Sequence, residues 1–134
     1  MEEYDGMVSA KRALIRSLNV PMVHLLQQYG LEKFHYNLRK LGFSTIHRSA
    51  SEYGLPLILG GAEANLWDLT NVYAAMARTL EHIDKWDGEY ALNDFDQANY
   101  HLVDDKEEEI ILAKTPPMLS TDAIWMTFES MKKL

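Results

Sequence analysis

Residues 13–26, Ala13-Leu14-Ile15-Arg16-Ser17-Leu18-Asn19-Val20-Pro21-Met22-Val23-His24-Leu25-Leu26, predict two helices separated by a sharp break. The break falls on Ser17-Leu18-Asn19, where two small polar residues flank one leucine. Pro21 suits the first turn of the second helix, because the N–H that proline lacks has no partner within a helix there. The break therefore displays a hydroxyl and an amide at a fixed spacing between two apolar helix faces.

Amphipathic periodicity predicts that the rest of the chain is mainly helical as well. Small polar residues that can cap a helix stand before three of the predicted helices, and glycines suit helix ends. Five helices are predicted. The first comes after Ser9, the second begins near Pro21, and the third spans residues 31–41. The fourth comes after Asn65 and has an apolar stripe from Leu66 to Leu80, and the fifth comes after Ser120.

Two segments lack helical periodicity. Residues 43–61 predict an irregular connector with one short helical turn, closed by Gly60 and Gly61. Residues 100–113 predict a short β-hairpin, with strands at Tyr100 and Leu102 and at residues 110–112, joined across the acidic residues 104–109. We therefore expect residues 1–134 to form a single, mainly α unit with one small β-hairpin.

Composition restricts the class of function. The chain has 134 residues, 47% of them hydrophobic, which is enough for a folded core. Its net charge of −7 argues against nucleic acid or an anionic membrane as the main partner. There are no cysteines, so disulfides, cysteine-ligated zinc and a thiol nucleophile are excluded. No apolar run is long enough to span a bilayer, so we expect any membrane anchor to lie outside this chain.

Four segments of the sequence share a likeness to a known family: residues 4–21, 53–63, 66–77 and 116–125. In the same order, they resemble the transpeptidase domain of class A penicillin-binding proteins, and most of all the branch called penicillin-binding protein 1C. Residues 81–114 carry little of this likeness.

The resemblance implies roles for Ser17 and Asn19. The family's catalytic elements are Ser-x-x-Lys, Ser-x-Asn and Lys-Thr-Gly, in that order along the chain. By resemblance, Ser17 is the catalytic serine of the second element and relays a proton to the leaving amine, while Asn19 binds the substrate amide. The serine nucleophile needs a neighbour to take its proton, and the departing nitrogen must gain one.

The resemblance also implies a parent protein and its setting. That parent cross-links peptidoglycan stem peptides through a serine acyl-enzyme, binds penicillin and other β-lactams, and acts at the periplasmic face of the bacterial inner membrane. We expect no cofactor and no metal, because the five histidines lack zinc-binding spacing and residues 104–109 lack the ligand pattern of a calcium loop.

The other two catalytic elements are not in place. Ser130-Met131-Lys132-Lys133 contains a Ser-x-x-Lys, but it follows Ser17 instead of preceding it. Lys114-Thr115-Pro116 has proline where the family has glycine. We therefore expect a central piece of a transpeptidase domain that is inactive alone, with the nucleophile before Met1 and the Lys-Thr-Gly strand after Leu134. Faces left uncovered in such a piece favour a homo-oligomer.

Two alternatives stay open at this point. Ser17 and Asn19 are also residues that cap helices, and they could serve the helix at Pro21 in that way, with or without a catalytic role. The chain could also be a stand-alone helical interaction module that retains the fold without catalysis.

Overall fold

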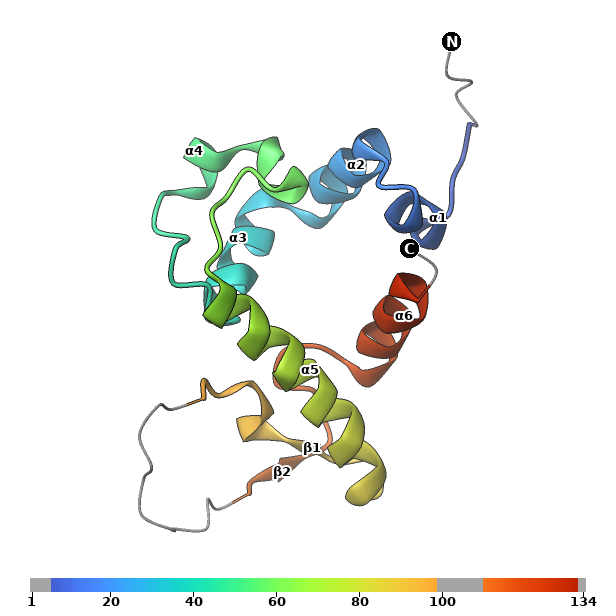
Figure 1. Ribbon diagram of the computed structural model, residues 1–134, viewed down its shortest axis with the longest axis vertical. Helices are drawn as coiled ribbons and strands as arrows, with labels where there is room; N and C mark the ends of the chain where they lie inside the picture. The colour runs from blue at the N-terminus through green and yellow to red at the C-terminus, as the bar shows by residue number, and fades with distance from the viewer. Residues whose placement is uncertain (1–5, 99–109, 133–134) are drawn as a thin grey trace.

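A computed structural model describes residues 6–98 and 110–132. In Figure 1 the helices follow one another around an open ring, and α1 and α6 lie side by side although they come from opposite ends of the chain. The mainly helical architecture is as predicted. The helices are α1 (Ala10–Ile15), α2 (Asn19–Tyr29), α3 (Leu31–Lys40), α4 (Ala50–Tyr53), α5 (Leu66–Lys85) and α6 (Thr121–Met131). In the described ranges none of them is long and apolar enough to cross a membrane.

Three helices begin at the polar residues that the sequence indicates. The side-chain oxygens of Ser9, Asn65 and Ser120 each accept a hydrogen bond from the backbone N–H three residues on, at 3.3, 2.7 and 3.4 Å. Such a bond satisfies an N–H that has no partner in the first helical turn, and it contributes about 1 kcal/mol. The starts of α1, α5 and α6 are therefore set by local chemistry.

The core consists of two clusters of buried side chains. One lies under α3, α4 and the short 3-10 segment η1 (Leu55–Leu59), and the other joins α5 to α6. Phe43, in the connector after α3, packs against both clusters and so links the two halves of the ring. The first cluster is Ile46, Tyr53 and Leu57, and the second is Val72, Met76 and Ile124.

Asp68, in the first turn of α5, fixes the connector after α3 to that helix. Its side chain is buried, and its Oδ2 accepts hydrogen bonds from the backbone N–H and the hydroxyl of Ser44, both at 2.7 Å. The amide of Asn65 donates a third bond to the same oxygen at 2.9 Å. The carboxylate thus serves the helix start and the neighbouring connector together.

The strand pairing differs from the prediction. The strand β2 (Leu112–Ala113) forms antiparallel pairs with β1 (Tyr90–Ala91), Tyr90 opposite Ala113 and Ala91 opposite Leu112. Its partner thus comes directly after α5, where burial of Ala91 holds the chain against that helix. The predicted partner strand at Tyr100 and Leu102, and the acidic tip at residues 104–109, lie outside the described residues. A second 3-10 segment, η2 (Leu92–Phe95), follows β1.

Two further boundaries differ from the prediction. α5 continues past Leu80 to Lys85 and ends where Asp87 and Gly88 adopt positive φ angles of 49° and 86°. The connector at residues 43–61 contains two short helical segments, α4 and η1, instead of one turn. Gly61 is required at the end of η1, because a Cβ there would lie 2.8 Å from the carbonyl oxygen of Pro56.

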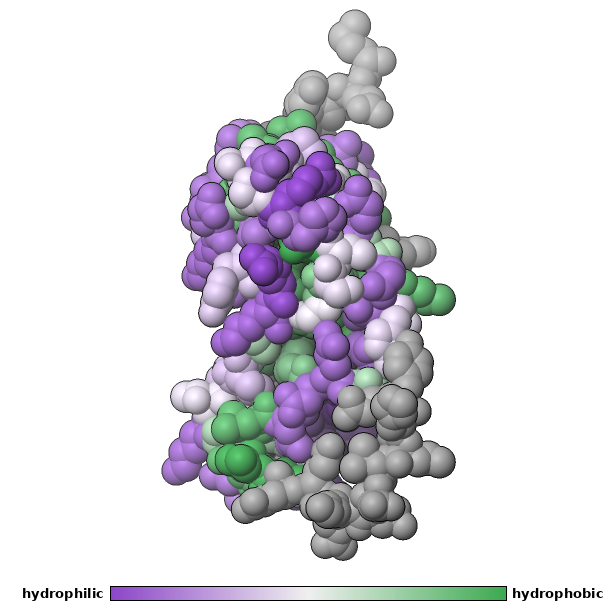
Figure 2. Space-filling model, turned by 90° about the vertical axis from the view of Figure 1, so that its left-hand side faces the viewer, coloured by the Kyte–Doolittle hydropathy of each residue, from purple (hydrophilic) through white to green (hydrophobic). Residues whose placement is uncertain are grey.

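Polar residues cover much of the face of the molecule that carries α4. Figure 2 looks onto this face and shows hydrophilic side chains over most of its upper part, with apolar residues gathered toward its lower end. This distribution contrasts with the helices on the other side of the ring, where large apolar side chains of α2 and α6 are exposed.

Candidate functional site

The corner between α1 and α2 is built around Ser17. The N–H of Ser17 donates to the carbonyl of Leu14 at 3.0 Å, and the N–H of Leu18 donates to the carbonyl of Ala13 at 2.9 Å. These two bonds form the closing pattern in which the residue after a helix takes the left-handed conformation. Ser17 has a φ of 51°, as this pattern requires.

A serine at this position is unusual, because glycine is the common residue there. A side chain in the left-handed region costs roughly 1–2 kcal/mol, which glycine avoids. The backbone is therefore strained at this residue, and the serine side chain places a hydroxyl at the corner. Backbone strain of this kind gathers at functional sites, which makes Ser17 a functional candidate on structural grounds as well.

Asn19 is the first residue of α2, and neither candidate residue caps that helix. The N-cap is Leu18, and no side chain bonds to the first turn. The capping role considered from the sequence is therefore wrong for α2. Both Ser17 and Asn19 are exposed, and within the described ranges their side chains have no hydrogen-bond partner. A hydroxyl and an amide are thus free to bind something outside these residues.

The motif at the end of α6 has no free nucleophile. The Ser130 hydroxyl is buried and donates to the carbonyl of Met126 at 2.8 Å. Lys133, the lysine of this Ser-x-x-Lys, lies outside the described residues. Its neighbour Lys132 forms an ion pair with Glu129. Ser130 therefore contributes to helix structure, in agreement with the expectation that its motif stands in the wrong order.

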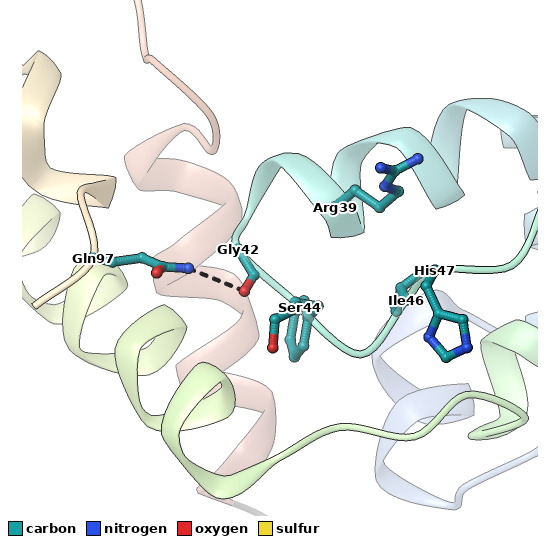
Figure 3. Close-up of a pocket in the computed structure, with 7 residues that line it drawn as sticks. Arg39, Gly42, Ser44, Ile46, His47 and Gln97 are labelled. Atoms are coloured by element: carbon teal, nitrogen blue, oxygen red, sulfur yellow. Dashed lines mark hydrogen bonds between the residues drawn. The ribbon is translucent and has the colours of Figure 1, made fainter.

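A hollow of about 360 Å³ lies between the end of α3, the connector after it and Gln97. Figure 3 shows Gln97 reaching across to the carbonyl of Gly42, a hydrogen bond of 3.1 Å, while Arg39 and His47 lie on the other side without pointing toward one another. The Ser44 hydroxyl in this hollow already donates to Asp68. The carboxylate of Asp68 also accepts from the N–H of Ser44 and the amide of Asn65, so this serine belongs to a structural network and we do not take the hollow as the candidate active site.

A pair formed by a buried acid and a half-buried histidine was missed by the sequence reasoning. His82 of α5 and Asp94 of η2 approach to 2.7 Å, and the imidazole packs on Trp86 with ring centroids 4.2 Å apart. Asp94 is buried, and its second carboxylate oxygen has no partner in the described chain. No sequence motif joins two residues on different elements, so only the fold could bring them together. Within residues 6–98 and 110–132, no three potential ligands gather to hold a metal.

Comparison with known proteins finds a relative that matches part of the chain. Penicillin-binding protein 1C of Escherichia coli (strain K12) is 41% identical over 75 residues, which is 56% of this chain. The chain is related to penicillin-binding protein 1C. It spans only about 10% of the length of that relative. No family model matches the chain, and no solved structure matches it.

Proposed function

We propose that the chain is part of a penicillin-binding D,D-transpeptidase that cross-links peptidoglycan stem peptides, with Ser17 and Asn19 in its active site. The observation that carries this proposal is the strained, exposed Ser17, which displays a free hydroxyl two residues before the free amide of Asn19. The relationship to penicillin-binding protein 1C supports the substrate class. It also supports a periplasmic location for the parent.

In the proposed reaction, a serine supplied by another part of the parent attacks the D-Ala-D-Ala carbonyl after giving its proton to a neighbouring lysine. The Ser17 hydroxyl passes a proton from this pair to the leaving amine, which departs as D-alanine and leaves an acyl-enzyme. The amine of a second stem peptide then attacks the acyl-enzyme and releases the serine. Penicillin would acylate the same serine by opening its β-lactam ring.

Asn19 has a separate role in this proposal. Its amide donates a hydrogen bond to the substrate carbonyl and accepts one from the lysine, so it positions both groups. The closing hydrogen bonds of α1 and the first turn of α2 hold the backbone of Ser17 and Asn19, so the corner fixes where the two side chains leave the chain. Groups that are held in place stabilise a transition state more than mobile ones, so a fixed backbone favours these roles.

The test is Ser17→Ala in the parent protein that contains this segment. We expect acylation by a fluorescent penicillin to slow by about a hundredfold or more, the usual loss for a proton-transfer group. The variant should keep its unfolding temperature. Ser9→Ala is the matched control, because it removes a helix cap and lowers stability by about 1 kcal/mol but should leave acylation unchanged. Equal acylation rates for Ser17→Ala and the unmodified parent would refute the role of Ser17.

The alternative of a different class is a helical interaction module that retains this fold without catalysis. The exposed apolar side chains of α2 and α6 favour it. In such a module Ser17→Ala would change only local stability. Acylation of the parent therefore separates the two functions.

A further inference from the structure

One of the two hydrogen bonds that close α1 around Ser17 has a buried alanine as its acceptor. The N–H of Leu18 donates to the carbonyl of Ala13, and the N–H of Ala13 donates to the carbonyl of Ser9, both at 2.9 Å. Ala13 is 2% exposed, and it is the one buried residue of α1. The backbone of the corner is therefore bonded to the residue at which α1 packs into the molecule.

Packing on neighbouring elements sets the position of α1. The helix has six residues, and an isolated helix of this length is not stable in water. It contacts α2 and α6, and Figure 1 shows α6 beside it. Ala10 and Leu14 of α1 line a hollow together with Ser130, a buried residue of α6. Ala13 does not line that hollow, so a larger side chain at residue 13 finds no such space beside it.

We propose that Ala13 is a positioning residue for the Ser17 hydroxyl, and that the small size of its side chain sets where the corner lies. This inference rests on the proposed transpeptidase function. In a close-packed interior a larger side chain forces the backbone to shift, so it would push α1 away from its neighbours. The corner would move with α1, because residue 13 itself accepts the bond from Leu18. A displacement of about 1 Å at a reacting group can slow a reaction about a hundredfold.

A purely structural alanine would behave differently. If Ala13 contributed only to stability, any substitution that destabilises the fold would affect acylation in proportion to the unfolded fraction. A positioning residue makes the rate depend on side-chain size instead. Glycine and valine separate the two roles, since both destabilise a buried helical position but only valine adds volume that pushes α1 outward.

The test is a double-mutant cycle of Ala13→Val and Ser17→Ala in the parent protein that contains this segment. The rate of acylation by a saturating concentration of a fluorescent penicillin is measured for the parent, both single variants and the double variant. We expect Ala13→Val to slow acylation about tenfold in the parent, by the effect of a small displacement. In the Ser17→Ala background it should slow acylation by at most about threefold, because the hydroxyl that it displaces is already gone.

Two further variants separate position from stability. Ala13→Gly preserves the space around α1, so it should lower the unfolding temperature but slow acylation much less than Ala13→Val does. Ala75→Val is the matched control, because Ala75 is also 2% exposed within a helix, but in α5 and outside the corner. It should lower the unfolding temperature and acylate as the parent does. Circular dichroism shows which variants are folded, and Ala13→Ser takes the place of Ala13→Val in the cycle if the valine variant does not fold.

Three results would overturn the inference and leave the proposed function standing, provided that Ser17→Ala itself is slow. One is an unchanged rate in the folded Ala13→Val variant. Another is equal slowing by Ala13→Val in both backgrounds, which would mean that residue 13 does not act through Ser17. The third is a loss in Ala13→Gly or Ala75→Val as large as that in Ala13→Val, which would assign the effect to stability. If Ser17→Ala acylates as fast as the parent, the proposed function fails, and the inference fails with it.

Discussion

Ser17 combines two properties that a purely structural residue would not need together. It closes α1 in the left-handed conformation, and its hydroxyl has no partner in the described chain. We predict that Ser17→Gly raises the free energy of unfolding by about 0.5 to 1 kcal/mol, because relief of the left-handed strain exceeds the extra entropy of glycine in the unfolded chain. Urea unfolding of the isolated chain measures this change.

Ser17→Ala is the comparison for that experiment. Alanine retains the same strained backbone and removes only the hydroxyl, so the free energy of unfolding should change by less than about 0.5 kcal/mol. If glycine stabilises the chain no more than alanine does, the corner is not strained. A gain in stability with glycine would instead show that serine is kept there at a cost.

Ser17 and Asn19 could be named as candidates from the sequence, but their setting could not be described from it. Spacing placed them in a break between helices, and the structure has that break. The left-handed conformation of Ser17 and the absence of a cap on α2 depend on how the two helices are oriented, which no local preference fixes. The pair of His82 and Asp94 could not be predicted from the sequence for the same reason, because the two side chains meet only when η2 packs on α5.

At the scale of elements, α5 is fixed at its start by Asp68. Asp68→Ala removes three hydrogen bonds and leaves the N–H of Ser44 without its partner. Since hydrogen bonds to a charged group contribute about 1.5–3 kcal/mol each and are not additive, we expect a loss of about 3 kcal/mol in the free energy of unfolding. Thermal or urea unfolding measures it.

Asp122→Ala provides the control for Asp68→Ala. Asp122 also lies in the first turn of a helix, but it is exposed on α6 and interacts mainly with the helix dipole. Its removal should cost less than about 1 kcal/mol. Equal losses from the two variants would show that Asp68 acts only on its own helix and does not hold the connector after α3.

Elements with local signals were predictable, and those that depend on distant contacts were not. Ser9, Asn65 and Ser120 mark helix starts because a cap is a bond within a few residues. β2 pairs with β1, which lies far from it in the sequence. The residues of a strand as short as this do not specify which other strand it will pair with. The end of α5 was placed too early because its apolar stripe weakens before the helix stops at the turn with Asp87 and Gly88.

At the scale of the whole molecule, Phe43 is the side chain that joins the two core clusters. It packs against the cluster of Ile46, Tyr53 and Leu57 and also against the cluster of Val72, Met76 and Ile124. Complete burial would make Phe43→Ala cost about 3–5 kcal/mol, and partial burial reduces the expected loss to about 2 kcal/mol. Because the link between the clusters is lost, we also expect unfolding to become less cooperative.

Urea unfolding followed by two probes tests this prediction. Tryptophan fluorescence reports mainly on α5 and α6, which contain Trp67 and Trp125, and far-ultraviolet circular dichroism reports on all the helices. In the unmodified chain the two curves should coincide, and in Phe43→Ala they should separate with a smaller apparent slope. Tyr36→Ala, at a side chain 63% exposed on α3, should keep the curves together. Coincident curves in Phe43→Ala would mean that the ring folds as one unit through contacts other than this phenylalanine.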